Sequence, residues 1–354
     1  MKSILKHTLP ALALSTILIA CKKDDNTGGE DIEQLKTEIL SDAATVVIVS
    51  SYEDMFTKAT ALSNAVSTLI ATTNDANLNT ARQAWKDMRT TWEQTEAWLF
   101  GPVDFDDIDP RIDTWPVDFT ALDGQLTSGN AFTEEYITEL PDDLKGFHPI
   151  EYLLWGQNGN KTAASFTARE KEYLSGLASN LKKLSESVKN SWANGYANTL
   201  KTAGASGNSD YPTQQSAFVE IADAMAGICG EVANEKMKGP FEANDPSQEE
   251  SPFAKNSITD FTNNIQGILK MYQGNFSTDG KGLEDLVRNY NLSLDNEIKA
   301  KHTAAIAALQ GITVPFGEAI STQQTQVQNA MNKINDLAST LDEKLKPFVL
   351  QYIK

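Results

Sequence analysis

Cysteine and histidine are scarce in this chain, which has two cysteines and three histidines among 354 residues. His7 belongs to an N-terminal segment with the composition of a cleavable signal, and Cys21 stands directly after it. With the Cys21 thiol modified after cleavage, Cys229 has no partner, so no intrachain disulfide can form even in an oxidising compartment. Cys229 stands among small apolar residues, which favours a buried structural thiol over a nucleophile. Imidazole chemistry would then depend on His148 and His302.

Positive charge and long apolar runs are also lacking. The chain has 30 Lys and Arg against 48 Asp and Glu, a net charge of −18, and no dense basic face that could bind nucleic acid. No apolar run of about 18 residues follows the N-terminal segment, so no transmembrane helix is predicted. The Gly-x-Ser-x-Gly elbow, a phosphate-cradling glycine loop and the zinc motif His-Glu-x-x-His are absent, which argues against the common hydrolase and nucleotide-binding designs.

The N-terminus has the pattern of an export signal. Two lysines precede an apolar stretch over residues 9–20, and Leu-Ile-Ala-Cys at 18–21 has the small residues of a cleavage site. This arrangement resembles a bacterial lipoprotein signal, which implies removal of residues 1–20 and lipidation of Cys21. The mature protein would be anchored to the outer membrane by lipid alone, facing the periplasm or the cell surface. An ordinary signal peptide with a chance cysteine is the alternative, and residues 21–30 are expected to form a tether.

Helical periodicity runs through nearly all of the remaining chain. Apolar residues recur at three- and four-residue steps, as at Ile32, Leu35 and Ile39, and strand-like alternation is almost absent. The pattern predicts an all-α protein of two packed helical bundles, 31–205 and 206–354, which meet at a Gly/Ser/Asn-rich segment. The expected helices cover 77–100, 117–126, 133–138, 147–155, 167–201, 212–237, 255–273, 283–310 and 321–350.

An Asp- and Pro-rich stretch over 103–116 interrupts this helical pattern after Gly101-Pro102, a typical helix stop. It is too long to be only a connector, so it is predicted to be a binding loop. Phe105 and Trp115 within it are expected to fill the seam between the bundles.

The helix before this loop carries an unusual face. Trp85, Arg89, Trp92 and Glu96 fall at i, i+4, i+7 and i+11, hence on one side, and Glu93 adds a second carboxylate. Burying a guanidinium and a carboxylate is costly unless they pair. The face is therefore a candidate binding surface, and the alternatives are an Arg89–Glu96 ion pair or a solvated edge.

His148 and Glu151 stand three residues apart where a helix is expected to begin near Gly146. Pro149 is tolerated in a first helical turn, so both side chains would project to one side. An imidazole with carboxylates suits borderline cations such as Fe, Zn, Mn or Cu. The alternative is structural, with Glu151 at the helix dipole and His148 as a cap. A two-histidine site would need His302, but His302 lies in a Lys-rich turn that we expect to be exposed. A one-histidine, carboxylate-rich site is therefore predicted.

Ser257 and Asp260 form a further candidate pair in the segment Glu249 to Asp260. Their spacing is that of a capping box at the start of a helix, which explains both residues without any ligand. They are otherwise candidates for the wall of a pocket.

These segments together resemble the imelysin family, also described as iron-regulated periplasmic proteins and grouped with metallopeptidases. Gly146-Phe147-His148-Pro149-Ile150-Glu151 matches the family's Gly-x-His-x-x-Glu motif, and Arg111 to Pro116 is similar to its Asn-Ser-Trp-Pro-like segment. Glu250 to Asp260 is similar to its Glu-Ser-x-Phe and Asn-Ser-x-x-Asp elements. The chain departs from the pattern at Pro149 and at Asp113-Thr114, the latter adding a carboxylate.

The resemblance implies two helical bundles with the motif in a cleft between them and a role in iron or haem acquisition at the cell envelope. The leading hypothesis is a lipid-anchored protein that binds a divalent or trivalent metal, iron favoured and haem as a further candidate, together with an envelope transport partner. The expected ligands are His148, Glu151, Glu96, Glu93 and Asp113, and the expected pocket residues are Arg89, Trp115, Ser257 and Asp260. The alternatives are a metallopeptidase with Glu151 or Glu96 as general base, and a non-catalytic module that binds a protein or glycan.

Overall fold

The computed structural model describes residues 31–354, and every regular element within them is helical. The all-α fold predicted from the sequence is confirmed. The predicted signal peptide over 1–20, the lipidation site Cys21 and the tether over 21–30 lie outside the described residues. In the described part no helix is both long enough and apolar enough to cross a membrane.

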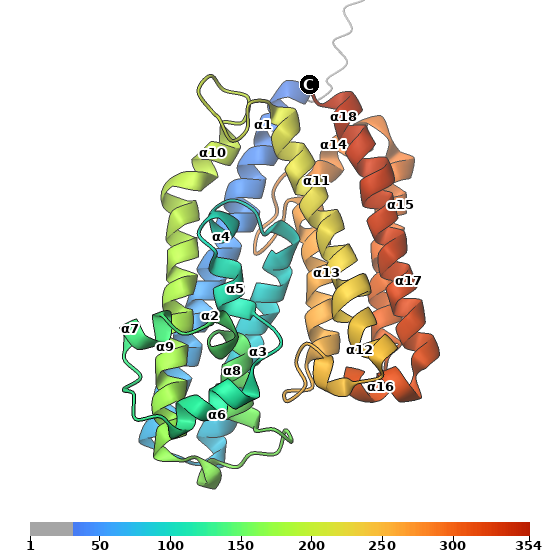
Figure 1. Ribbon diagram of the computed structural model, residues 1–354. Helices are drawn as coiled ribbons and strands as arrows, with labels where there is room; N and C mark the ends of the chain where they lie inside the picture. The colour runs from blue at the N-terminus through green and yellow to red at the C-terminus, as the bar shows by residue number, and fades with distance from the viewer. Residues whose placement is uncertain (1–30) are drawn as a thin grey trace, which may run out of the picture. The chain divides into compact units, whose positions relative to one another are not determined.

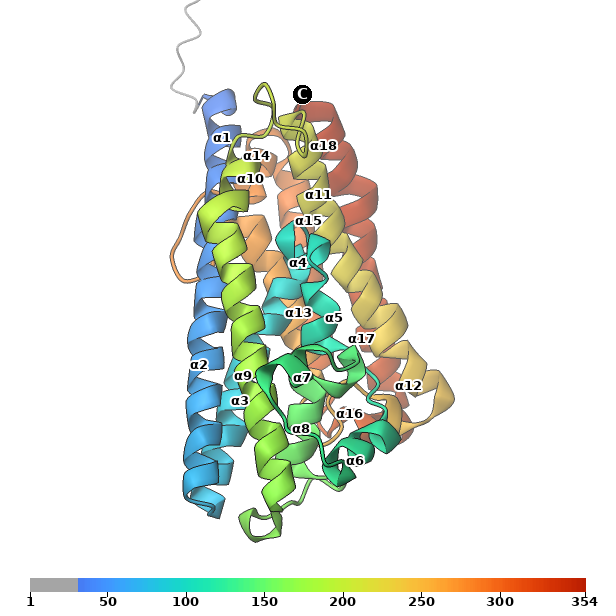
Figure 2. The same cartoon turned by 60° about the vertical axis from the view of Figure 1, so that its left-hand side comes forward.

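Residues Ile32–Lys354 form one compact unit whose long helices run side by side (Figure 1). The long helices are α1 (Ile32–Asp42), α2 (Ser50–Ala71), α3 (Asp75–Thr95), α9 (Ala168–Ser191), α11 (Gln214–Glu231), α13 (Ser257–Gln273), α15 (Leu292–Gln310) and α17 (Gln324–Thr340). α2 packs against α3 and α9, whereas α17 packs against α11 and α15. α3 packs against α13, which joins the two groups (Figure 2). The division into bundles over 31–205 and 206–354 stays a prediction.

Shorter helices connect the long ones, and five of them, α4 to α8, lie between α3 and α9 in the sequence. They are α4 (Pro102–Phe105), α5 (Ile108–Asp113), α6 (Phe119–Thr127), α7 (Glu134–Thr138), α8 (Phe147–Trp155), α10 (Ala197–Lys201), α12 (Lys238–Ala243), α14 (Leu283–Tyr290), α16 (Phe316–Thr322) and α18 (Lys346–Tyr352). The predicted loop over 103–116 is therefore largely helical, because α4 and α5 occupy most of it.

Local sequence chemistry accounts for where several helices begin. The side chain of Asn74 accepts a hydrogen bond from the backbone N–H of Asn77 and so caps α3. Thr167 and Glu170 form a reciprocal capping box at the start of α9. These caps satisfy backbone donors that have no partner within the helix.

Four turns of wider, π-helical geometry interrupt or extend the long helices of the described chain. They are η1 (Ala43–Val49), η5 (Trp192–Tyr196), η6 (Val232–Lys236) and η8 (Leu341–Leu345). A π turn inserts an extra residue and rotates the helix face that follows, and such turns are frequent at functional sites. Lys236 at the end of η6 points into the site described below.

The predicted seam residues behave differently from each other. Phe105 does not fill a seam, because it is 62% exposed and packs edge-on against Tyr196 with ring centroids 5.6 Å apart. Its place at the end of the short helix α4 leaves it on the surface. Trp115 lies over the imidazole of His148 instead, with ring centroids 4.9 Å apart. The expectation for Phe105 was therefore wrong. Trp115 is part of the site around His148 that is described below.

Candidate functional site

Charged and polar side chains from separate parts of the chain meet where α3 packs against α13. The close approach of these helices depends on Gly267, since a β-carbon there would lie 2.2 Å from the carbonyl oxygen of Gln94. The side chains that meet are Arg89, Glu93 and Glu96 of α3, Asp113 of α5, His148 and Glu151 of α8, Lys236 of η6, Glu250 of the following loop, and Asp260 and Asn264 of α13.

Arg89 lies at the centre of this group and is fully buried. Its Nη2 lies 2.6 Å from Oε1 of Glu93 and 2.6 Å from Oε1 of Glu250, and its Nη1 donates to Asp113. Nε is 3.6 Å from Asp260. Arg89 therefore pairs with Glu93 one turn along its own helix, and the Arg89–Glu96 pair considered from the sequence was wrong. A buried guanidinium is tolerated only with such compensation.

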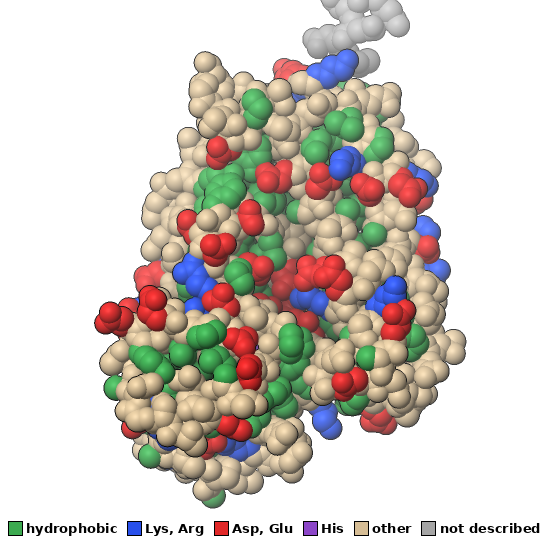
Figure 3. All heavy atoms as spheres, in the orientation of Figure 1, with side chains coloured by type: hydrophobic (Ala, Val, Ile, Leu, Met, Phe, Trp, Pro, Cys, Tyr) green, Lys and Arg blue, Asp and Glu red, His purple; other side chains and the backbone are tan. Residues whose placement is uncertain are grey.

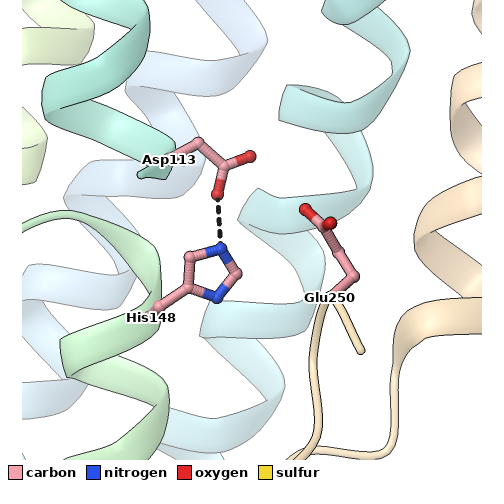
Figure 4. A group of neighbouring side chains, drawn as sticks. All are labelled: Asp113, His148 and Glu250. Atoms are coloured by element: carbon pink, nitrogen blue, oxygen red, sulfur yellow. Dashed lines mark ion pairs between the residues drawn. The ribbon is translucent and has the colours of Figure 1, made fainter. Parts of the chain in front are cut away.

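Asp113 connects Arg89 to the histidine. Besides the bond from Arg89, it accepts a 2.6 Å hydrogen bond from Nε1 of Trp92, and its Oδ1 lies 3.0 Å from Nε2 of His148 (Figure 4). Burial alone would raise the pKa of Asp113, but the charge of Arg89 and the neighbouring imidazole of His148 hold it well below its usual range. Asp113 is thus an ionised carboxylate in the interior.

Gly146 allows Asp113 and His148 to meet. It precedes α8 with φ of +81°, and a β-carbon at this position would lie 2.2 Å from the carbonyl oxygen of Ile112, the residue before Asp113. Only glycine combines this φ with so close a backbone approach. The glycine of the Gly-x-His-x-x-Glu motif therefore sets the distance between α5 and α8.

His148 is fully buried, with its two nitrogens directed toward carboxylates. Nε2 faces Asp113, and Nδ1 lies 3.6 Å from Oε2 of Glu151, so both motif side chains project to one side as expected, with Pro149 as the third residue of α8. Burial lowers the pKa of His148, but the neighbouring carboxylates of Asp113 and Glu151 outweigh it and raise the pKa to about 9. Both nitrogens come close to oxygen atoms, yet neither makes a well-directed hydrogen bond. A small rotation of the ring would bring either nitrogen into hydrogen-bond geometry.

Glu151 ties α8 to the loop before α13. Its Oε1 accepts hydrogen bonds from the backbone N–H groups of Phe253, at 2.9 Å, and Ala254, at 2.7 Å. Its Oε2 faces His148 and has no hydrogen-bond donor in the described residues. One oxygen of Glu151 is therefore structural, and the other remains directed at the imidazole.

Glu93 and Glu96 form the acidic end of the group. Nδ2 of Asn264 donates to Oε2 of Glu93 at 2.8 Å and to Oε2 of Glu96 at 2.7 Å, and Nζ of Lys236 lies 2.9 Å from Oε2 of Glu96. Burial raises the pKa of Glu93 to about 8 despite Arg89, and burial together with Glu93 raises that of Glu96 well above its usual range. The interior thus holds more carboxylates than its cations neutralise.

Ser257 and Asp260 do not form the capping box considered from the sequence, because Asn256 caps α13 without a side-chain bond. The Ser257 hydroxyl donates to Oε2 of Glu249 at 2.8 Å, and Asp260 accepts from the Ser251 hydroxyl at 2.6 Å and from Nδ2 of Asn256 at 2.7 Å. Both residues fix the loop that carries Glu249 and Glu250.

The ligand atoms of two triads lie within 4.8 Å of one another and could hold a metal ion: Asp113, His148 and Glu250, and Glu93, Glu96 and Asp113. Figure 4 shows Asp113 and His148 pointing at each other, with Glu250 facing them from the loop. Four of the five ligands expected from the sequence, His148, Glu96, Glu93 and Asp113, occur in these triads, whereas Glu151 occurs in neither.

Sequence reasoning missed Glu250 and Lys236 as members of the group. Glu250 was visible only as part of the Glu-Ser-x-Phe element, and the π turn that directs Lys236 inward has no periodic signal in the sequence. His302 was also misplaced: it lies within α15, buried, and its Nε2 is 3.0 Å from the carbonyl oxygen of Ile265. It takes no part in the site.

A cavity of about 290 Å³ gives access to this group from the surface. Trp115 and Lys236 line it together with six carboxylates, Glu96, Asp109, Asp113, Glu231, Glu235 and Glu250. Figure 3 shows acidic side chains gathered around the middle of this face. We call this space the acidic cavity.

Comparisons with known proteins show which family the chain resembles in sequence and fold. The sequence model of the imelysin family matches residues 48–342. A protein named iron-regulated protein A from Synechococcus elongatus is 31% identical over 313 residues, which cover 86% of this chain and 84% of that protein.

Two solved structures share the fold. A protein assigned as an iron-regulated protein A precursor from Parabacteroides distasonis has a TM-score of 0.81 at 26% identity, covering 89% of this chain and 95% of that one. An imelysin-like protein from Psychrobacter arcticum has a TM-score of 0.75 at 13% identity, covering 91% and 97%. The chain belongs to the imelysin family.

Proposed function

We propose that this protein binds a metal cation, iron favoured, in the buried group reached through the acidic cavity, as an iron-related protein of the cell envelope. The observation that supports this most directly is the triad Asp113, His148 and Glu250, whose ligand atoms lie within 4.8 Å of one another. Imidazole nitrogen suits iron, zinc and copper, and carboxylate oxygen suits harder cations, so one imidazole with two carboxylates is compatible with iron.

The surrounding charges fit a cation. Besides this triad, Glu93, Glu96 and Glu151 face the same interior, and burial keeps the pKa of Glu93 and Glu96 raised. A divalent ion would supply the positive charge that Arg89 and Lys236 alone do not. Three buried atoms lack well-directed hydrogen bonds: Nδ1 and Nε2 of His148 and Oε2 of Glu151. They are therefore available to coordinate an ion or to turn toward one. Binding through His148 would require its proton to leave.

The acidic cavity favours a small ion over haem. Its volume is about 290 Å³ and six of its lining residues are carboxylates, whereas cofactor pockets are mostly apolar. The names of the relatives from Synechococcus and Parabacteroides associate those proteins with iron. The N-terminal segment resembling a lipoprotein signal would keep the protein at the outer membrane, where a transport partner could receive the ion.

The metallopeptidase hypothesis has less support from the geometry. Oε1 of Glu151 already accepts two backbone hydrogen bonds, and Oε2 of Glu96 is held by Lys236 and Asn264. One oxygen of each carboxylate is thus engaged, the second oxygen of Glu151 faces His148, and Glu151 does not line the acidic cavity through which water would enter. Binding without hydrolysis is the function that the site supports better.

Calorimetric titration of the full chain with Fe(II), Zn(II) and Cu(II) tests the proposal. We expect one tight site in the wild type, and affinity about a hundredfold lower in Asp113→Asn and in His148→Gln, because each removes a ligand. Glu53→Gln, an exposed carboxylate on α2, is the control and should bind as the wild type does. Binding that is unchanged in both site variants would rule out this site.

A further inference from the structure

A second cavity, of about 660 Å³, lies next to the acidic cavity. Gln248 lines both cavities, and its carbonyl oxygen accepts a 3.3 Å hydrogen bond from Nε1 of Trp115. Pro116, the next residue, lines the second cavity. The Trp115–Gln248 contact therefore lies between two spaces of different chemistry. The volume of the second one is typical of small-molecule sites.

Three aromatic rings form one wall of this second cavity, which we call the aromatic cavity. Phe119 of α6, Tyr152 of α8 and Phe253 of the loop before α13 pack together, with ring centroids 5.2 to 5.6 Å apart. Phe119 and Tyr152 remain partly exposed. Their faces carry the negative potential of an aromatic π system.

Glu249 is an acidic residue in the wall of the same cavity, and it lacks a counter-charge. It is only 4% exposed. Its Oε2 accepts hydrogen bonds from the Ser257 hydroxyl and the backbone N–H of Gly317, whereas its Oε1 accepts none from the described residues. None of the ion pairs among the described residues involves Glu249. Burying a carboxylate without a positively charged partner costs free energy, and a cation bound beside it would offset that cost.

Asp245 adds a second carboxylate to the cavity lining. Its oxygens accept hydrogen bonds from Ser247 and from Nε2 of Gln248, and no lysine or arginine lines the cavity. Aromatic faces next to unpaired carboxylates attract a particular class of ligand, an organic cation, because the rings and the carboxylates each favour positive charge.

We propose that the aromatic cavity binds an organic ammonium group, with the cation near Oε1 of Glu249 and its carbon substituents against Phe119 and Tyr152. This site goes beyond the metal site, because it uses a different carboxylate and a wall that offers no nitrogen ligand. The metal and the ammonium ligand would occupy adjacent cavities on either side of Trp115. The ammonium group could belong to a free small amine or to a lysine side chain of a protein partner.

Titration of the full chain with choline and with its neutral isostere 3,3-dimethylbutan-1-ol tests the charge requirement. We expect choline to bind about tenfold more tightly, since the two compounds differ only in the positive charge. A lysine-containing peptide and the same peptide with acetylated lysine form the second arm, which distinguishes the two sources. Equal affinity for each charged compound and its neutral counterpart, or no binding of any, would overturn the proposal.

Substitutions in the wall of the aromatic cavity test where choline binds. Glu249→Gln should weaken choline binding about tenfold and Phe119→Leu several-fold, whereas Phe105→Leu, an exposed aromatic elsewhere on the surface, should bind as the wild type does. His148→Gln should lose metal affinity and keep choline affinity. This variant therefore distinguishes a failure of the metal proposal from a failure of the ammonium proposal. Undiminished binding in both Glu249→Gln and Phe119→Leu would place the ligand elsewhere. If Glu249→Gln does not fold, Phe119→Leu and the isostere comparison still decide.

Discussion

The missing side chain of Gly146 and the carbonyl oxygen of Ile112 determine how closely α5 approaches α8. A β-carbon at residue 146 would lie 2.2 Å from that oxygen, a distance that no relaxed structure permits. Because Asp113 follows Ile112 and His148 follows Gly146 by two residues, this contact controls the 3.0 Å separation of Asp113 and His148. The motif glycine therefore acts on the site through the backbone.

Gly146→Ala is expected to separate α5 from α8. The positive φ and the clash together should destabilise the fold by about 1–3 kcal/mol and weaken metal binding. Thermal unfolding and calorimetric titration measure the two effects. Gly129→Ala is the control, since nothing lies within 4 Å of a β-carbon there, and it should change neither. A Gly146→Ala variant as stable as the wild type would contradict this role.

Arg89→Met should be among the most destabilising single substitutions in the chain. It leaves Glu93, Asp113 and Glu250 buried without their shared guanidinium, and removing one partner of a buried ion pair costs about 3–5 kcal/mol. Arg288→Met removes an exposed Arg–Glu pair on α14 and should cost less than about 1 kcal/mol. Urea unfolding compares the two variants, and similar losses would argue against Arg89 as the central cation.

The protonated His148 should stabilise the metal-free protein in a pH-dependent way. Its pKa rises from 6.5 to about 9 on folding, so the stabilisation is complete below pH 6.5 and is lost as pH rises through 9. The shift corresponds to about 3 kcal/mol. We expect the difference in unfolding free energy between wild type and His148→Gln, measured with a chelator present, to be larger at pH 6 than at pH 9.5 by about this amount. A difference that is constant with pH would show that folding does not shift the pKa of His148.

Helical periodicity predicted the parts of the site that lie on one helix. The spacing of Trp85, Arg89 and Trp92 placed them on the same face of α3, and the three-residue step from His148 to Glu151 placed those side chains together. The same periodicity also predicts that His302 is buried. Asp295, Ile298 and His302 share the buried face of α15, although Lys299 and Lys301 beside them look exposed.

Contacts between distant segments could not be predicted in this way. Lys236 reaches Glu96 across 140 residues, and Glu250 reaches Arg89 across 161. The contact of Lys236 depends on a π turn. Such a turn breaks the 3.6-residue period, so the period does not predict which way Lys236 points. The partner of Arg89 was misjudged for a local reason: Glu93 lies at i+4, within reach of Arg89, whereas Glu96 begins a 3₁₀ turn and meets Lys236.

Glu151 offers a test of whether the motif carboxylate holds the loop that carries Glu250. Its Oε1 accepts hydrogen bonds from Phe253 and Ala254, and hydrogen bonds to a charged group contribute about 1.5–3 kcal/mol each. Glu151→Ala should therefore release this loop and expose the bond after Lys255, a surface residue with φ of +53°.

Limited digestion with trypsin measures this release. We expect cleavage after Lys255 to become at least about tenfold faster in Glu151→Ala, because opening of the loop limits the rate when cleavage itself is fast. Glu151→Gln keeps an acceptor oxygen for the two N–H groups and should show a smaller increase. Glu172→Ala, an exposed residue of α9, is the control. Since His148 faces the other oxygen of Glu151, equal cleavage rates in Glu151→Ala and wild type would mean that the carboxylate serves the imidazole alone, and that the loop is held by Ser257 and Asp260.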